Sequence, residues 1–238
     1  MHGQGVKGLM SDSIDSTCFL QTVSPLLAGG DASVLASAVS ARWRPTQLKG
    51  LLDDRDVEVR RIAAVTIGLV GGREAIDWLV AALHDVDEQV NRMAEHGLWA
   101  IWFRCGSPEA AGPFRRGMAM IAAERYPEAI ACFDESSAID PTFAEASNQC
   151  AIAHWFLYQW QQAIADCQRS LTIEPRHFGS LASLGHCYAQ LGQLHRALDC
   201  YQRAMRINPR MDGVRAAVNR LDSHVAKHGH LPTSRWMN

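Results

Sequence analysis

The sequence lacks several features that mark common classes of protein. Its 238 residues contain no apolar run close to the ~18 residues that a membrane-spanning helix needs, and residues 1–22 hold no apolar stretch like the core of a secretory leader. The formal net charge is only −2, and no block of like charge stands out, so nothing in the composition attracts nucleic acid or an anionic membrane in general. We therefore expect no membrane partner, no nucleic-acid partner and, by default, a cytoplasmic location.

Motifs that carry common enzymatic chemistry are also missing. There is no Gly-x-Ser-x-Gly, no phosphate-cradling glycine loop and no dinucleotide fingerprint. The seven cysteines have no short paired spacing, and most lie in stretches of helical periodicity, which predicts reduced, buried thiols. His186, Cys187, His195 and Cys200 are zinc-type residues without a familiar zinc spacing, and His154 is interpreted as a core histidine. We expect no catalytic residue, no metal, no cofactor and no small-molecule substrate.

What the sequence does contain is a period of 34 residues. Pro141, Pro175 and Pro209 are separated by this distance, and each follows an apolar–polar pair. Small residues recur twelve and twenty-four positions before each proline, and a larger residue recurs eight positions before it. Small residues are needed where two antiparallel helices approach closely, the larger residue is expected to fill the gap toward the next unit, and proline ends the second helix. The recurring residues are Ala129, Ala163 and Ala197, then Gly117, Ala151 and Gly185, and then Phe133, Cys167 and Tyr201.

This pattern resembles the tetratricopeptide repeat over roughly residues 110–209. The resemblance implies an all-α fold, a right-handed α-solenoid of stacked antiparallel helix pairs. Its three units would span 110–143, 144–177 and 178–211, followed by a capping helix that ends near residue 227. Glu124 and Tyr158 stand where the family usually has a glycine between the two helices of a unit, so we expect a different conformation in those turns.

A second repeat with another period precedes this array. The pattern Leu-x-Asp-x-Asp-x-x-Val-x-x-x-Ala occurs at residues 52–63 and again at 83–94, and a fainter copy lies near residues 26–38. Its aspartates are placed to cap helix N-termini. Residues 52–64 resemble a HEAT repeat, closest to that of phycobilisome lyase-like proteins. The expected organisation is a flexible segment 1–24, HEAT-like repeats 25–107, the three units with their capping helix 108–227, and a flexible tail 228–238.

The resemblance also implies a function and a surface. In tetratricopeptide arrays the first helix of each unit lines a concave groove, so we expect a non-catalytic protein–protein interaction scaffold that binds a partner peptide or helix there. Some family members hold the C-terminal carboxylate of chaperones with a set of Lys, Asn and Arg side chains. The matching positions here are Phe114, Met118, Gln149, Gly179 and Ser183, which do not supply this set, so we expect no binding of this kind. Phe114, Met118 and Trp155 could equally pack in the core. The candidate partner-binding residues are Phe114, Met118, Ile121, Asn148, Gln149, Ile152, Trp155, His186 and Gln190.

Two other classes of function remain open at this point. The HEAT-like part would suit an accessory or lyase-like protein that acts on a protein-bound chromophore or another substrate, although a repeat fixes a fold without fixing a function. Basic residues between Arg42 and Arg61 would suit nucleic acid, but acidic residues such as Asp54 and Glu58 interleave with them. Mixed charge of this kind is typical of a solvated face.

Overall fold

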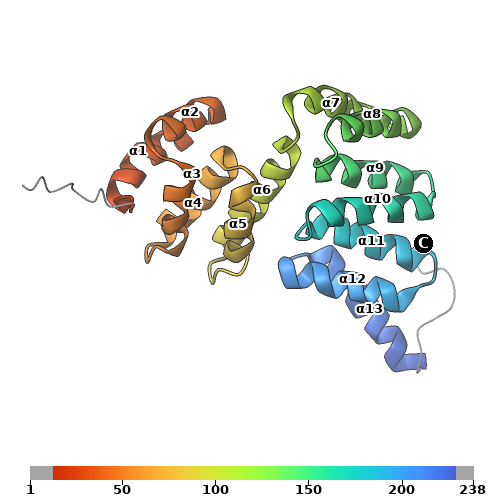
Figure 1. Ribbon diagram of the computed structural model, residues 1–238. Helices are drawn as coiled ribbons and strands as arrows, with labels where there is room; N and C mark the ends of the chain where they lie inside the picture. Colours follow the sequence, from red (N-terminus) through yellow and green to blue (C-terminus); the bar gives the residue numbers. More distant parts are fainter. Residues whose placement is uncertain (1–12, 229–238) are drawn as a thin grey trace, which may run out of the picture. The chain divides into compact units, whose positions relative to one another are not determined.

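A computed structural model of the protein describes residues 13–228, and these residues form helices and connecting loops without any strand (Figure 1). The expected all-α helical-repeat fold is confirmed. The expectations for residues 1–12 and 229–238 lie outside the described residues. The chain divides into two compact units between Ile101 and Trp102. None of the helices in the described part of the chain is both long and apolar enough to cross a membrane.

The first unit begins with a helix in a segment expected to be flexible. Helix α1 starts at Ser16, because Asp15 caps it by accepting a hydrogen bond from the backbone N–H of Cys18 at 2.7 Å, and because Phe19 and Val23 are buried. The expectation of a loose segment up to residue 24 is thereby corrected for Ser16 onward. The helices of this unit are α1 (Ser16–Ala28), α2 (Ala32–Arg42), α3 (Pro45–Leu48), η1 (Lys49–Asp53), α4 (Val57–Val70), η2 (Arg73–Ala75), α5 (Ile76–Ala82) and α6 (Glu88–Arg104), the last of which runs past Ile101 into the second unit.

The repeated aspartates do cap helices, as the sequence predicts. Asp31 accepts from the backbone N–H groups of Ser33 and Val34 at the start of α2, and Asp56 accepts from Glu58 at the start of α4. The capping carboxylates satisfy backbone donors that have no partner inside the helix. One short sequence pattern therefore starts a helix in each HEAT-like repeat.

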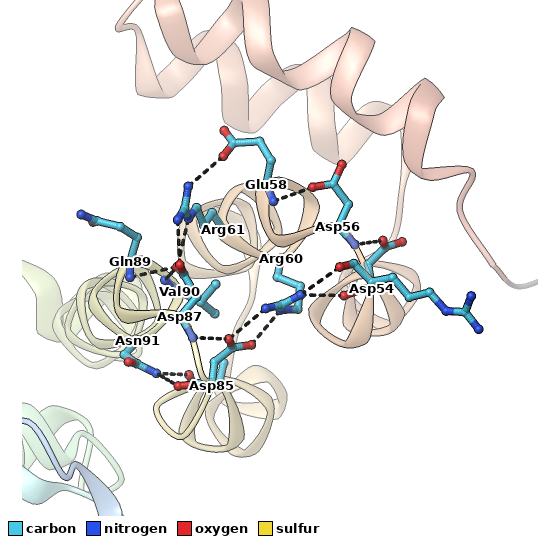
Figure 2. Close-up of polar contacts among 12 residues, drawn as sticks. Asp54, Asp56, Glu58, Arg60, Arg61, Asp85, Asp87, Gln89, Val90 and Asn91 are labelled. Atoms are coloured by element: carbon cyan, nitrogen blue, oxygen red, sulfur yellow. Dashed lines mark hydrogen bonds and ion pairs between the residues drawn. The ribbon is translucent and has the colours of Figure 1, made fainter.

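Two arginines of α4 tie neighbouring HEAT-like repeats together (Figure 2). Arg60 donates to both carboxylate oxygens of Asp85, at 2.8 and 3.0 Å, and Arg61 donates to both oxygens of Asp87, at 2.9 and 2.7 Å. Asp87 also accepts from the backbone N–H groups that begin α6. These fork-shaped pairs occupy two of the guanidinium groups that, in the sequence, suggested a nucleic-acid face.

Helices α4 and α6 come unusually close at a pair of glycines. A Cβ atom built on Gly68 would lie 2.4 Å from the Cα atom of Gly97, closer than real atoms approach. The two backbones can therefore touch only because both residues lack a side chain.

The second unit contains the three helix pairs expected from the 34-residue period and one further helix. Each proline of the period lies just after the second helix of a pair, and α7 runs through Pro113 without a break. Within the unit, α9 contacts both α7 and α11, so the first helices of the pairs form a continuous row. The helices are α7 (Pro108–Ala122), α8 (Tyr126–Ile139), α9 (Ala144–Phe156), α10 (Trp160–Ile173), α11 (Phe178–Gln190), α12 (Leu194–Ile207) and α13 (Asp212–His228).

The small and large residues of the period match each other inside each pair. A Cβ atom on Gly117 would lie 2.5 Å from the Phe133 ring, and one on Gly185 would lie 2.5 Å from the Tyr201 ring. Each ring thus lies over the glycine of its own unit, and Phe133 also shares a core cluster with Ala146 and Cys150 of the next unit. The middle pair has Ala151 and Cys167 instead, which divides the volume differently between the two positions.

The turns without glycine keep the backbone conformation that glycine would have. Glu124 and Tyr158 have φ angles of 57° and 59°, and Gly192 at the matching position of the third unit has 69°. The expectation of another conformation is wrong. The Schellman-like geometry of the helix end requires a left-handed residue, and the chain adopts it with ordinary side chains at a steric cost.

The division between the units falls earlier than the expected boundary at residue 107. Trp102, at the end of α6, stacks on His177 with ring centroids 4.1 Å apart and meets Phe178 edge-on at 5.0 Å. Phe103 meets Phe114 of α7 at 5.8 Å. The last turn of α6 belongs to the second unit because its aromatic side chains pack there.

Candidate functional site

The row formed by α7, α9 and α11 carries the candidate partner-binding residues, and they differ in exposure. Phe114 is only 4% exposed and lies among Phe103, Phe133 and Phe143, with ring centroids 4.7–5.8 Å from its own. This side chain holds α7 against the start of α9. Its contacts are those of a core residue.

Asn148 and Gln149 belong to a buried polar network. Their side-chain amides donate to Oε1 of Glu145, at 3.2 and 2.6 Å, and Glu145 is itself fully buried. The Nδ1 atom of His177 accepts from the backbone N–H of Ser180 at 3.0 Å, so the proton lies on Nε2, which donates to Oε2 of Glu145 at 2.7 Å. The network joins α9 to the start of α11 and leaves these two amides turned inward.

The remaining six candidates are half-buried. Met118 and Ile121 pack against the core around Phe133, and Trp155 packs against the core around Tyr201. His186 places Nδ1 2.8 Å from the Tyr201 hydroxyl. Ile152 and Gln190 complete the set. A surface of mixed apolar and polar atoms is therefore available along the row, and its role in partner binding remains a prediction.

A group of aromatic side chains, two of them exposed, adjoins this row near the turn between α9 and α10. Tyr126 stacks on Phe156 at 4.7 Å, Trp155 meets both Phe156 and Trp160, and Tyr158 meets Trp160 at 5.5 Å. Phe156 is 43% exposed and Tyr158 is 77% exposed. We call these five residues the aromatic cluster. The sequence analysis missed four of them, although four aromatic residues within residues 155–160 are a visible signal.

Another hollow lies on the second helices of the last two pairs. It has a volume of about 590 Å³ and is lined from α10, α11 and α12. In it Arg196 lies over the Tyr188 ring, 4.1 Å from the centroid, so one wall is both aromatic and cationic. None of the candidate partner-binding residues lines this hollow.

The zinc-type residues are not brought together as a set. His186 faces Tyr201, Cys187 and Cys200 are buried, and His195 is exposed. Burial raises the pKa of Cys187 to about 12 and that of Cys200 to about 11, so both thiols stay protonated at neutral pH. Elsewhere in the described residues, Cys150, His154 and Asp166 do converge within the reach of a single ion.

Comparison with known proteins matches both repeat systems. The tetratricopeptide repeat family matches residues 151–223, and the HEAT repeats match residues 45–123. A TPR repeat-containing protein of Rhizobium etli is 29% identical over 106 residues, which are 44% of this chain and 52% of that protein. The chain thus spans about half the length of this curated relative.

Similar solved structures were also found. The Sgt2 TPR domain from Aspergillus fumigatus is 17% identical, with a TM-score of 0.49, over 56% of this chain and 91% of that chain. The TPR2AB domain of yeast Sti1, solved in complex with pHSP90, is 18% identical, with a TM-score of 0.44, over 91% of this chain and 86% of that chain.

The helix pairs and their period define a protein built from helical repeats. In particular, the chain carries tetratricopeptide repeats in residues 151–223 and HEAT-like repeats in residues 45–123.

Proposed function

We propose that the protein is a non-catalytic interaction scaffold that binds a partner peptide or helix along the concave face of its tetratricopeptide array. The observation that carries this proposal is the aromatic cluster beside the first-helix row. Phe156 and Tyr158 expose large apolar surfaces next to the half-buried Ile152 and Trp155. Exposed apolar patches of this kind mark interaction sites, and aromatic residues dominate binding energies at interfaces.

The chemistry of the surface indicates the kind of partner. Apolar and aromatic side chains outnumber charged ones among the half-buried candidates and the aromatic cluster, so the guest should present two or three apolar anchors. Burying one such anchor contributes about 2 kcal/mol, so two or three give a micromolar complex. An amphipathic helix or an extended peptide with apolar side chains satisfies this requirement.

The test is selection of displayed random peptides on the full chain, followed by affinity measurements on the enriched sequences. We expect peptides with aromatic or aliphatic anchors, and at least tenfold weaker binding by Phe156→Ser. The matched control is Ile139→Ser, because Ile139 also ends a helix and is 44% exposed, against 43% for Phe156, but lies outside the cluster. Equal affinities of the two variants, with circular dichroism showing both folded, would contradict the proposed surface.

The lyase-like alternative predicts a different result. A chromophore-handling accessory would bind a free bilin or a bilin-carrying protein through the HEAT-like unit, and Phe156→Ser would leave that binding unchanged. Titration of the full chain with a bilin, followed by absorbance, distinguishes the two proposals.

A further inference from the structure

Three side chains from two helices of the second tetratricopeptide unit converge beside the core. Cys150 and His154 lie one turn apart on the same face of α9, and Asp166 comes from α10. A sulfur, an imidazole nitrogen and a carboxylate oxygen of these residues all lie within 4.8 Å of one another. His154 Nε2 and Asp166 Oδ2 are 3.6 Å apart.

A fourth donor lies within reach on α8. Oδ1 of Asp134 is 3.9 Å from the Cys150 sulfur. Asp134 is exposed, so its side chain can turn toward the other three without moving the backbone. A fourth ligand from a third helix would therefore require Asp134 to rotate toward the ion, because only the other three donors already lie within 4.8 Å of one another.

The histidine is oriented as a ligand would be. Its Nδ1 atom lies 2.6 Å from the side-chain oxygen of Gln159, which can only accept, so Nδ1 carries the proton. The neutral ring then has its lone pair on Nε2, the atom that faces Asp166. Histidines that bind metals usually donate their other ring N–H to an oxygen in this way.

Two of the three side chains are almost completely buried. Cys150 is 1% exposed and Asp166 is 5% exposed. Arg169 lies 3.3 Å from Oδ1 of Asp166, while Oδ2 lies 3.6 Å from His154 Nε2.

We propose that Cys150, His154 and Asp166 bind one divalent transition-metal ion of the zinc class, with Asp134 as the fourth ligand. A thiolate, an imidazole and carboxylates are the ligands that zinc takes in tetrahedral sites, with bonds of about 2.0–2.3 Å and donor atoms therefore about 3.5 Å apart. Calcium and magnesium require oxygen ligands and do not suit the thiol. Binding breaks the S–H bond of Cys150, forms the metal–sulfur bond and releases the proton to solvent.

The ion would fix the turn that carries the aromatic cluster. His154 and Asp166 flank residues 155–165, so a metal bound by both closes this segment into a loop. The site itself does not depend on the proposed partner binding, and it departs from the expectation of no metal drawn from the sequence.

The experiment uses the full chain without an affinity tag, stripped of metal and titrated with Co²⁺ at pH 7.5. We expect a thiolate-to-cobalt absorption band that saturates at one ion per chain and is displaced by Zn²⁺. Cys150→Ser should abolish the band, and Asp166→Asn and His154→Gln should weaken binding at least tenfold. The matched control is Cys187→Ser, since Cys187 is also 1% exposed but lies in the core with Cys167 and Cys200.

Several outcomes would overturn the site. These are a cobalt band that survives in Cys150→Ser, a band lost in Cys187→Ser, or no saturable binding at micromolar Co²⁺ or Zn²⁺. If Cys150→Ser fails to fold, the test depends on His154→Gln, at a half-buried position. Circular dichroism checks that this variant is folded before its cobalt binding is compared with that of the wild type. Zn²⁺ should also raise the Tm of the wild type and of Cys187→Ser and leave that of His154→Gln unchanged.

Discussion

The two units are stabilised by different kinds of contact. In the HEAT-like unit, Arg60 and Arg61 reach from one repeat to Asp85 and Asp87 of the next. In the tetratricopeptide unit, the ring of Phe133 or Tyr201 lies against a glycine that leaves room for nothing larger. Charged pairs respond to pH and salt, whereas close packing does not, so the two units should fail under different perturbations.

The largest effect should come from removing an aromatic ring that lies on a glycine. We expect Phe133→Ala to lower the free energy of unfolding of the tetratricopeptide unit by about 3–5 kcal/mol, because Phe133 is fully buried and its ring covers Gly117. Hydrogen exchange of peptides from α7 and α8, measured by mass spectrometry, reports this unit separately. Protection unchanged in those peptides would show that the ring does not hold the pair together.

The middle helix pair supplies a sharper version of this test. Gly117→Ala and Phe133→Cys together recreate the Ala151 and Cys167 combination in the first pair. Gly117→Ala alone should clash with the ring and Phe133→Cys alone should leave a cavity, so we expect the double variant to be less destabilised than the sum of the two by about 0.5–3 kcal/mol. Strict additivity would show that the two positions do not share one volume.

The helix pairs could be predicted from the sequence because one steric rule recurs in every unit. The positions of Gly117 and Gly185, together with the prolines that follow each second helix, predicted the three helix pairs and their order along the chain. The contact of each ring with the glycine of its own unit was not predicted, since a 34-residue period gives the same alignment whether a ring meets its own unit or the next one.

The candidate site was harder to predict, because periodicity describes neighbours along a helix and says little about neighbours across helices. Asn148 and Gln149 turn toward Glu145, a fully buried carboxylate that the repeat pattern does not reveal. Asp166 joins Cys150 and His154 only because α10 folds back beside α9. The sequence shows that aromatic residues are concentrated within residues 155–160, but it does not show which of their side chains are exposed.

A smaller effect is expected from breaking a charged pair of the HEAT-like unit. Arg60→Met should cost about 2 kcal/mol, because Arg60 and Asp85 have side chains only 13% and 12% exposed and share two hydrogen bonds. Arg116→Met is the matched control, because the Arg116–Glu135 pair is 55% and 53% exposed, and exposed pairs contribute under about 1 kcal/mol. Hydrogen exchange in residues 50–100 should rise for the first variant alone. Equal effects would contradict the distinction between the two pairs.

Acidification should destabilise the HEAT-like unit before the tetratricopeptide unit. The loss of stability should be smaller than that caused by Arg60→Met, because protonation of the aspartates leaves some hydrogen bonds in place. Burial alone would raise the pKa of Asp85, but hydrogen bonds from Arg60 and from the backbone of Asp87 lower it, and Arg61 lowers the pKa of Asp87 well below its usual range. Because these pKa values are depressed by folding, the stabilisation is present above pH ~4 and is lost as the pH falls further.

The pKa of Asp166 is shifted in the opposite direction. Burial raises its pKa, so its contribution favours the folded state below pH ~4 and is lost as the pH rises through the folded pKa. Hydrogen exchange corrected for the intrinsic rate at each pH should show earlier loss of protection around α4 and α6 than around α9 and α10. The reverse order on acidification would contradict the assignment of charge to one unit and packing to the other.

The smallest effect concerns the turns of the tetratricopeptide unit, where packing forces a left-handed residue. A non-glycine residue in this conformation costs about 1 kcal/mol, so Glu124→Gly should stabilise the unit by roughly that amount or somewhat less, because glycine also gains freedom in the unfolded chain. Gly192→Ala should destabilise it by a similar amount. Thermal unfolding of the two variants measures the pair of opposite shifts.

Tyr158→Gly relieves the same strain but removes the most exposed ring of the aromatic cluster, so it should raise Tm while weakening peptide binding. Tighter or unchanged peptide binding by this variant would show that the strained tyrosine is not retained for a partner.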